Sequence, residues 1–490
     1  MKRFYKNILW VFAIFLLSYL AIFYNLDKPS IFIYDEAVYA NNALEMSIDK
    51  DFLVLHSGGE PTLYNVKPPL VIWMQCLLIW LFGAGELAIR LPSALATFGT
   101  CLILFFFARR WLSERIGLMA VLAFVTTMGI IRDHVARSGD LDAVLVFLIA
   151  AYTFLSFHFL LKEGQATRKY FIGMAIIVSA AFLCKSLAGF MPLLGLLLAA
   201  LAVGRAKYLF KLPHIFIAAG FVAFVFITYY AVRQYLLPGY ISVVWYSEYS
   251  RFTQNIMPWH EHPFWYYLET MYNRFYKGYI WLLLLSPILW IKSNTIQRQI
   301  ATLAIVFAAV YMLVISIPAV KLDWYQAPVY PCLSLLIAMI LNEILVYILQ
   351  LIKSSKMTTV LTFCFIAAFF SYPYYLIYRQ NLNYHPISPF EREGFAMRAM
   401  HRSMPQYDRY KVFMPLITHE AHLLAAQFYA RAYSPSDTAQ IQVVNAYESL
   451  KTGDSVLLAQ VEVLPQIQER FKTTLLAEVE GAQLIELQNR

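Results

Sequence analysis

The sequence predicts an α-helical polytopic membrane protein that carries a small α/β domain at its C-terminal end. Of the 490 residues, 60% are hydrophobic and only 14% are charged, whereas soluble proteins average about 25% charged residues. Apolar runs follow one another through the first 380 residues, and several reach the roughly 20 residues that a membrane-spanning helix needs. From residue 385 the composition becomes that of a soluble protein. We therefore expect a membrane domain over 1–380 and a soluble domain over 385–490.

Short clusters of Lys and Arg between the apolar runs predict the direction of each span. Such clusters mark cytoplasmic loops, so the basic N-terminus MKRFYKN is placed in the cytoplasm. The run 70–82 is too short to cross comfortably, and if it lies along the outer surface, every later basic cluster faces the cytoplasm. The result is a bundle of about 11–13 spans with helices on the outer membrane surface. Eleven are assigned, over about 8–26, 88–108, 116–131, 141–161, 170–184, 187–203, 212–236, 278–291, 300–317, 327–351 and 358–378.

This topology places two long loops, 27–87 and 238–277, and the soluble domain on the outer side. The soluble domain is expected to contain strands at 411–417 and 455–463 and helices at 418–432 and 464–472. The formal net charge of +9 does not indicate a nucleic-acid partner, because the cations lie in inter-span clusters rather than in one groove. The five cysteines occur singly inside apolar runs and predict neither a disulfide framework nor a zinc site.

The unusual ionisable residues collect on the outer side. Ionisable groups at a membrane boundary are costly and usually functional, so this convergence predicts an outward-facing polar site. The residues are Asp35, Glu36, Lys67, Arg132, Asp133, His134, Arg137, Asp140, Asp142, Lys185, Glu248, Arg251, His260, Glu261, His262, Lys321 and Asp323.

The adjacent acids Asp35 and Glu36 are the first candidates for catalysis. Neighbouring side chains point in different directions, so one acid can act as general base while the other binds or orients. A carboxylate at a partly dry site has its pKa raised toward working pH, which suits a base. The alternative is that Asp35 caps a helix that begins at Glu36.

The remaining candidates each have a structural alternative. Lys67 precedes Pro68-Pro69 on an extended segment and could hold a phosphate, or it could be a snorkelling interfacial anchor. Lys321, flanked by Tyr325, is a second phosphate contact or a plain loop cation. Asp140 and Asp142 stand at the entrance to a span and could bind substrate or cap a helix. His260 and His262 share one face of an extended segment and could bind a metal, although two histidines without a third ligand are also typical of an aromatic interfacial loop.

Several blocks resemble the GT-C class of polyprenyl-phosphate-dependent glycosyltransferases, in the branch of bacterial protein O-mannosyltransferases and the lipid A aminoarabinose transferase. The blocks that carry the resemblance are YDEAVYANNALEM, VKPPLVIWMQ, GELAIRLPSALAT and RSGDLDAVLVF, with weaker echoes in FLCKSLAGFMPL, in the WYSEYSRF and HEHPFWYYL loop, and in KLDWYQAPVYP. Their order matches across roughly the first 335 residues.

The resemblance implies a fold and a reaction. A sugar on a polyprenyl phosphate would be transferred, with inversion, to an acceptor hydroxyl or phosphate on lipid A, a protein or a surface glycan, at the outer face of the bacterial inner membrane. It implies no required cofactor and leaves a divalent cation open, because metal dependence varies within the class. The residue roles it implies are catalysis by Asp35 with Glu36 as its companion, donor-phosphate binding by Lys67, and a place for Asp140 and Asp142 in the second acidic segment, where they would bind substrate. As a hypothesis for the mechanism, the nearby cations Arg137 and Lys321 join Lys67 at the donor phosphate, and Tyr39 and Tyr325 contribute to substrate binding.

Two other classes fit the composition. A transporter or lipid flippase would place ionisable residues deep in the spans and open to both faces. A non-catalytic scaffold would explain the composition but not the convergence of charged residues on one side.

Overall fold

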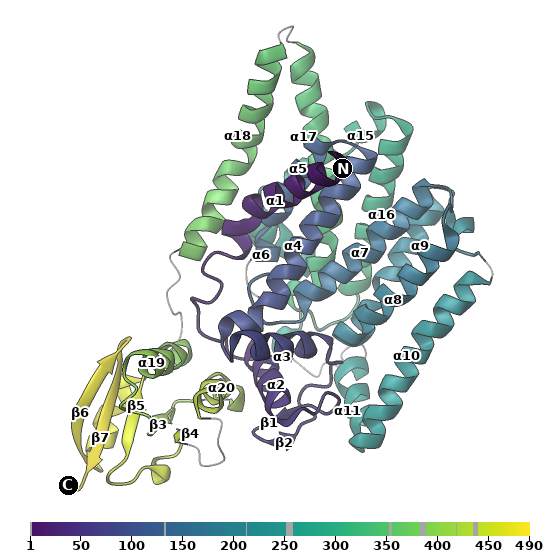
Figure 1. Cartoon of the computed structure of the whole chain (residues 1–490). Coiled ribbons are helices and arrows are strands. Elements are labelled where there is room, and N and C mark those ends of the chain that lie inside the picture. Colours follow the sequence, from purple (N-terminus) through teal and green to yellow (C-terminus); the bar gives the residue numbers. More distant parts are fainter. Residues whose placement is uncertain are drawn as a thin grey trace.

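A computed structural model describes residues 2–131, 134–211, 213–250, 258–351, 355–382, 389–417, 419–434 and 440–490. It consists of a helical bundle with a small sheet-containing domain at one end (Figure 1). Eight helices of the described chain are long and apolar enough to cross a membrane. They are α1 (Lys2–Ile22), α4 (Glu86–Trp111), α7 (Asp142–Leu161), α8 (Thr167–Lys185), α10 (His214–Leu236), α16 (Thr295–Ser316), α17 (Tyr330–Gln350) and α18 (Ser355–Leu382).

The predicted polytopic fold is confirmed, and eight of the eleven assigned spans are described helices long and apolar enough to cross a membrane. The other three predicted spans are present as short helices: α5 (Glu114–Val125) with α6 (Met128–Ile131), α9 (Pro192–Ala202) after the 3-10 turn η1 (Ser186–Gly189), and α14 (Ile280–Leu283) with α15 (Ile288–Ile291). An α-helix rises about 1.5 Å per residue, so none of these crosses a hydrocarbon core alone. Counting apolar residues missed the breaks because turns inside an apolar run leave its composition unchanged.

The first outer region folds into α2 (Asp35–Asp49), the short strands β1 (His56–Ser57) and β2 (Glu60–Pro61), and α3 (Leu70–Phe82). Helix α3 lies across the end of the bundle (Figure 1). Its bounds are those of the run 70–82, which was predicted to lie along the membrane surface. Gln75 points inward and donates to the carbonyls of Ile89, at 3.0 Å, and Gly139, at 2.7 Å. The opposite face exposes Leu77, Trp80 and Leu81, as befits a helix lying in a membrane interface.

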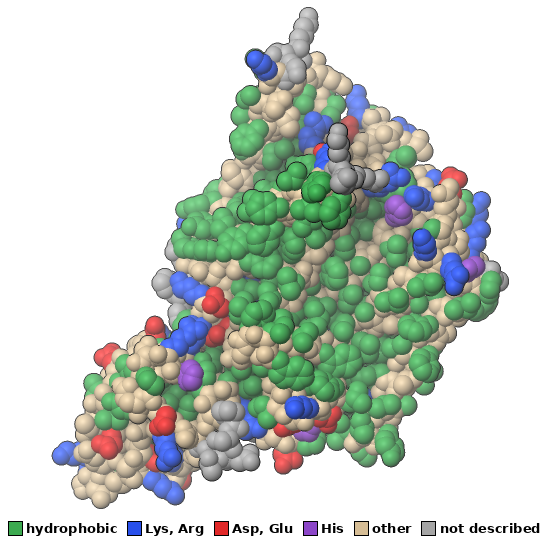
Figure 2. Space-filling view, viewed as in Figure 1, with side chains coloured by type: hydrophobic (Ala, Val, Ile, Leu, Met, Phe, Trp, Pro, Cys, Tyr) green, Lys and Arg blue, Asp and Glu red, His purple; other side chains and the backbone are tan. Residues whose placement is uncertain are grey.

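The described parts of the second loop predicted to face outward, and of the remaining connections, form short helical turns. They are η2 (Ala206–Tyr208), α11 (Tyr240–Val244), η3 (Trp245–Tyr249), η4 (Pro258–His260), α13 (Tyr266–Thr270), η5 (Met271–Phe275) and η6 (Asp323–Val329). Figure 2 shows that hydrophobic side chains dominate the visible surface of the bundle. Helices α10 and α18 bury little of their apolar surface inside the protein, so most of it is available to lipid.

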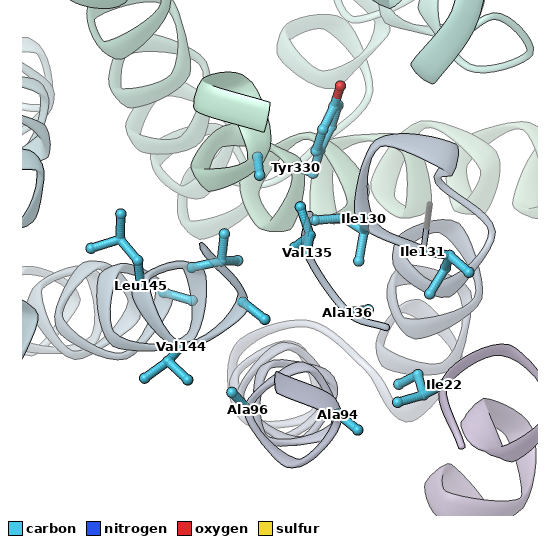
Figure 3. Close-up of a cluster of buried hydrophobic side chains, with 14 of the residues drawn as sticks. Ile22, Ala94, Ala96, Ile130, Ile131, Val135, Ala136, Val144, Leu145 and Tyr330 are labelled. Carbon is cyan, nitrogen blue, oxygen red and sulfur yellow. The ribbon is translucent and has the colours of Figure 1, made fainter. Parts of the chain in front are cut away.

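The buried core extends to the loop between α6 and α7, which carries several site candidates. Figure 3 shows Val135 and Ala136 of this loop among apolar side chains of α1, α4, α6, α7 and α17. Val135 and Ala136 are at most 1% exposed. The polar residues that follow them are therefore anchored to close-packed core rather than to a free loop.

The C-terminal domain is α/β, as predicted. It comprises α19 (Pro389–Ser403), β3 (Tyr410–Phe413), η7 (Glu420–His422), α20 (Leu424–Tyr433), β4 (Ile441–Val444), η8 (Tyr447–Ser449), β5 (Ser455–Leu458), η9 (Val461–Val463), α21 (Leu464–Gln468), β6 (Lys472–Val479) and β7 (Ala482–Gln488). The five strands form a sheet in the order β4-β3-β5-β7-β6. Strand β3 pairs parallel with β4 and β5, and β7 pairs antiparallel with β5 and β6. The expected helix over 464–472 ends at Gln468, because its last residue begins β6.

The turn between α8 and α9 depends on one glycine and yields a test of the fold. A Cβ on Gly189 would lie 2.6 Å from the backbone carbon of Ala181, and backbone atoms of a packed helix cannot move away cheaply. Gly189→Ala should therefore lower the unfolding temperature in detergent, by an overpacking penalty of about 1–3 kcal/mol. Gly220→Ala in α10, where a Cβ meets nothing within 4 Å, is the matched control and should keep or raise that temperature. Equal temperatures for the two variants would contradict the packing described here.

Candidate active site

Asp35 is the first residue of α2 and lies at the end of the bundle where α2 and α3 sit (Figure 1). Tyr34 occupies the N-cap position with no side-chain cap hydrogen bond, so the structure does not use Asp35 as the predicted helix cap. The side chain is half-buried, and within the described part of the chain no hydrogen bond or ion pair occupies its carboxylate. Its negative charge nonetheless influences Tyr39 and Asp140. Asp35 is thus an acid available to a substrate.

Glu36 is held rigidly inside the protein. Arg90 of α4 binds it through two hydrogen bonds, Nε to Oε1 at 2.7 Å and Nη2 to Oε2 at 2.8 Å. The backbone amides of Phe32 and Gly139 each donate to it at 2.7 Å. Both side chains of the ion pair are at most 1% exposed. With two guanidinium donors and two amide donors, the acceptor capacity of Glu36 is used by the protein, so this acid orients its surroundings.

A second buried pair joins Asp140 to His134 of the loop between α6 and α7. His134 Nδ1 lies 2.6 Å from Asp140 Oδ2, and Ser138 Oγ donates to the same oxygen at 3.1 Å. The His134 ring stacks on Trp324, with centroids 3.8 Å apart. Burial lowers the pKa of His134, but the Asp140 carboxylate outweighs it and raises that pKa above its ordinary value. His134 is therefore a cation at neutral pH and neutralises Asp140.

A third pair joins the start of α7 to the end of α8. Lys185 Nζ donates to both carboxylate oxygens of Asp142, at 2.7 and 2.6 Å. The same ammonium lies 5.3 Å from the centre of the Tyr325 ring, a cation–π contact. Tyr39 is buried in the same region, and burial together with the charge of Asp35 raises its pKa well above the ordinary value. Tyr39 therefore stays a neutral hydroxyl.

Asp142, Lys185 and Tyr325 border a pocket of about 780 Å³. The predicted residues Lys67, Asp142 and Tyr325 line it, together with Lys185 and Glu248. Lys67 forms an ion pair with Glu248. Its position is set from α2, because Asn42 accepts a hydrogen bond from Asn65 at 3.0 Å and Asn65 in turn accepts one from the Lys67 amide at 3.0 Å. Each lysine is paired with an acid of the same pocket, Lys67 with Glu248 and Lys185 with Asp142. The pocket wall thus offers two ammonium groups that a phosphate can engage in exchange for these partners.

Two cations that we assigned to the donor phosphate have other partners. Arg137 donates to carbonyls at the end of α1, including Ile22 at 3.0 Å and Tyr24 at 2.9 Å. Lys321 is 2% exposed and donates to the carbonyls of His262, at 2.8 Å, and Pro318, at 2.5 Å. Neither is among the residues that line the pocket. Both side chains are held by backbone carbonyl groups from distant parts of the chain, and sequence spacing could not reveal these partners.

The metal prediction for His260 and His262 receives no support from the geometry. Within the described ranges, no three His, Cys, Asp or Glu side chains come together in a way that could hold a metal. The His262 ring stacks on Tyr266 with centroids 3.9 Å apart. Asp140 and Asp142 are neutralised by His134 and Lys185. A metal role for His260 and His262 stays a prediction, and no step proposed below uses a cation.

Three residues predicted to belong to the outer polar site, Arg132, Asp133 and Arg251, lie outside the described residues. Arg90 was not predicted as a site residue, although an arginine inside an apolar helix is a recognisable functional signal, and here it is fully buried. Lys185 and Glu248 were recognised as outward charges without a role. Pairing could not be read for any of them, because each partner lies far away in the sequence.

The chain is similar to known proteins in its middle part and in its fold. Residues 66–230 match the family described as Dolichyl-phosphate-mannose-protein mannosyltransferase. An uncharacterized protein of Aquifex aeolicus is 25% identical over 325 residues, 66% of this chain and 62% of that protein. The Undecaprenyl phosphate-alpha-4-amino-4-deoxy-L-arabinose arabinosyl transferase of Edwardsiella ictaluri is 29% identical over 242 residues, 48% of this chain and 42% of that protein. The chain thus matches about half the length of these curated relatives.

Solved structures show the same fold over nearly the whole chain. ArnT from Cupriavidus metallidurans, bound to undecaprenyl phosphate, superposes with a TM-score of 0.65 at 15% identity, covering 98% of this chain and 97% of that one. The archaeal oligosaccharyltransferase AglB from Archaeoglobus fulgidus superposes with a TM-score of 0.52 at 12% identity, covering 87% and 64%. The resemblance that the sequence blocks indicate is therefore confirmed.

The buried Glu36–Arg90 pair should dominate the stability of the site. Arg90→Met leaves the Glu36 carboxylate buried without its cation, and breaking such a pair costs about 3–5 kcal/mol. We expect a large fall in unfolding temperature. Glu36→Leu combined with Arg90→Met removes both charges and should recover part of the loss. A double variant less stable than Arg90→Met would contradict the pairing.

The His134–Asp140 pair predicts a loss of stability in alkali. A pKa of His134 raised from 6.5 to about 9 means that its stabilisation is fully present below pH 6.5 and is lost as the pH rises through about 9. The unfolding temperature of the wild type should fall between pH 7 and pH 9.5 more than that of His134→Gln. His401→Gln, a change in the C-terminal domain, is the control and should retain the wild-type slope. Parallel slopes for wild type and His134→Gln would exclude the ion pair.

Proposed function

We propose that this chain, which has the fold of the polyprenyl-phosphate-dependent GT-C glycosyltransferases, is an inverting glycosyltransferase. It moves a sugar from a polyprenyl-phosphate carrier to an acceptor at the outer face of the bacterial inner membrane. One observation carries the proposal: the Asp35 carboxylate, not engaged by the described residues, lies near enough to Asp142 and Lys185 for its charge to act on both, and these two residues line the pocket that Lys67 also lines. A base and a phosphate site side by side are what transfer from a lipid phosphate requires.

The donor's two halves match two neighbouring cavities. The pocket lined by Lys67 and Lys185 suits the phosphate. An apolar groove of about 1330 Å³ runs between α8, α9 and α10 and shares Leu187 with that pocket. A polyprenyl tail needs such an apolar surface next to its phosphate, and a groove that opens toward lipid lets the carrier enter from the bilayer.

The chemistry then follows from the positions of the side chains. The acceptor oxygen forms a bond to the anomeric carbon on the face opposite the phosphate, while the bond from that carbon to the phosphate oxygen breaks and leaves its electron pair on the phosphate. Asp35 takes the acceptor's proton, a contribution worth about 10²–10⁴ in rate. Lys67 and Lys185 stabilise the charge on the departing phosphate. Attack from the opposite face inverts the anomeric configuration.

The buried pairs prepare the site for this step. Glu36 with Arg90 holds the first turn of α2, and Asp142 holds Lys185 at the pocket wall. Groups locked in place before the reaction need not reorganise during it, which is the main source of electrostatic catalysis. Tyr39 and Tyr325 add hydroxyl groups that can bind sugar oxygens. Arg137 and Lys321 are assigned to backbone support rather than to the phosphate.

The arabinosyl transferases among the relatives indicate the donor to test first: undecaprenyl phosphate carrying 4-amino-4-deoxy-L-arabinose, with a lipid A acceptor. Polyprenyl-phosphate mannose with a protein hydroxyl is the second pair, since the matched family is named for that chemistry. A transporter would place charge pairs along a path through the bundle. Here the pairs of Glu36, Asp140 and Asp142 lie at one end, which favours the transferase.

The decisive variant is Asp35→Asn, assayed as protein purified in detergent with each donor and acceptor pair. The wild type should release undecaprenyl phosphate only when the acceptor is present, and Asp35→Asn should lower kcat by about 10²–10⁴ with unchanged affinity for undecaprenyl phosphate. Lys67→Met should instead weaken that affinity. Full turnover in Asp35→Asn would remove it as the base, and lipid movement across liposomes without sugar transfer would establish the transporter instead.

A further inference from the structure

The segment that leads into Asp35 is held by the C-terminal domain. Arg398 of α19 donates to the carbonyls of Asp27, at 2.9 Å, and Lys28, at 2.8 Å. Tyr429 of α20 accepts a hydrogen bond from the Ile31 amide at 2.9 Å. A domain that is separate in sequence is thus bonded directly to the chain just before the proposed base.

Glu86 joins the two parts of the protein at this contact. It is 4% exposed and accepts from Arg398 Nη1 at 2.8 Å and from Tyr429 OH at 2.7 Å. Glu86 begins α4, and Arg90 lies one turn further along the same helix. Arg90 donates to the carbonyls of Pro29, at 2.8 Å, and Ser30, at 2.6 Å. The segment 27–34 is consequently clamped between α4 on one side and the C-terminal domain on the other.

The clamped segment ends at Tyr34, whose backbone is held in a strained conformation. Its backbone has φ of 68° and ψ of −122°, a conformation that a bulky side chain adopts only at a cost of about 1–3 kcal/mol. Such strain persists only where the surroundings over-determine it. The hydroxyl of Tyr34 lies 2.8 Å from Nε2 of His422 in the C-terminal domain, and the two rings meet edge to face at 5.4 Å. The next residue is Asp35.

We infer that His422 is a positioning residue for the proposed reaction: by binding Tyr34 it holds the strained N-cap of α2 and so aims the Asp35 carboxylate at the acceptor. This inference rests on the proposed function. The C-terminal domain would thus help to orient the catalytic base, because His422 belongs to that domain and Asp35 belongs to the membrane domain. The acceptor then approaches Asp35 along a boundary formed by both domains.

The contact is placed so that its catalytic and structural effects can be separated. Tyr34 is 47% exposed, whereas His422 is 5% exposed. Tyr34→Phe, which removes only a part-exposed hydroxyl, is therefore the variant that costs little global stability. The domain interface is held mainly by the buried Glu86, Arg398 and Tyr429 contacts, which a change at His422 leaves in place. A loss of turnover without a loss of unfolding temperature is therefore the signature of positioning.

The test uses the full chain with Tyr34→Phe, His422→Phe, the double variant and His422→Gln, whose amide can replace Nε2. In the donor and acceptor assay, each single Phe variant should lower kcat about 3- to 10-fold with unchanged affinity for undecaprenyl phosphate. The double variant should be no slower than the singles, and His422→Gln should recover most of kcat. The control is His401→Phe, since His401 stacks on Tyr433 within the same domain, and its kcat should match the wild type.

Hydrogen exchange of the peptide that covers residues 30–40 separates this inference from the proposed function. It should be faster in Tyr34→Phe and His422→Phe and unchanged in His401→Phe, whether or not the donor has been identified. If the wild type turns over no donor while exchange changes as stated, the proposed function fails and the clamp stands. Unchanged exchange and kcat in His422→Phe, or a double variant slowed by the product of the single effects, would overturn the inference.

Discussion

The candidate site depends on the buried ion pair between Glu36 and Arg90. Two arginine–carboxylate hydrogen bonds, with amides of Phe32 and Gly139 on the same carboxylate, join the start of α2 to α4 and to the loop before α7. A charge removed from water in this way must be fully paired, or it would destabilise the fold. The pair therefore fixes the relative placement of three segments, and Asp35, Tyr39 and Asp140 lie on two of them.

The same rule of neutralisation explains why one acid stands apart. Asp140 is paired with His134 and Asp142 with Lys185, so two of the remaining acids are already balanced within the protein. Asp35 lies only half-buried, and no described residue forms an ion pair with it. A reactive carboxylate surrounded by satisfied pairs has a defined orientation and an open face, and the C-terminal domain restrains the segment that carries it.

Sequence position was enough to single out Asp35 and Lys67 as candidates, because both lie in the loop that follows the first predicted span. Their roles stay predictions. The carbonyl partners of Arg137 and Lys321 could not be read from the sequence, because a cation beside a phosphate and a cation bound to backbone carbonyls have the same sequence surroundings. The ion pair of Arg90 with Glu36 was equally out of reach, although a charged residue inside an apolar helix is itself a visible signal.

By itself, the sequence determined that this is a polytopic membrane protein with its unusual charges on one side and a small α/β domain at its end. Hydrophobicity and charge clustering act locally and are readable along the chain. Only the tertiary structure decided which charges pair, since Arg90 reaches 54 residues to Glu36, Lys185 reaches 43 to Asp142 and Arg398 reaches 312 to Glu86. The energy of a buried charge depends on its neighbours in space, and packing of distant helices alone brings those neighbours together.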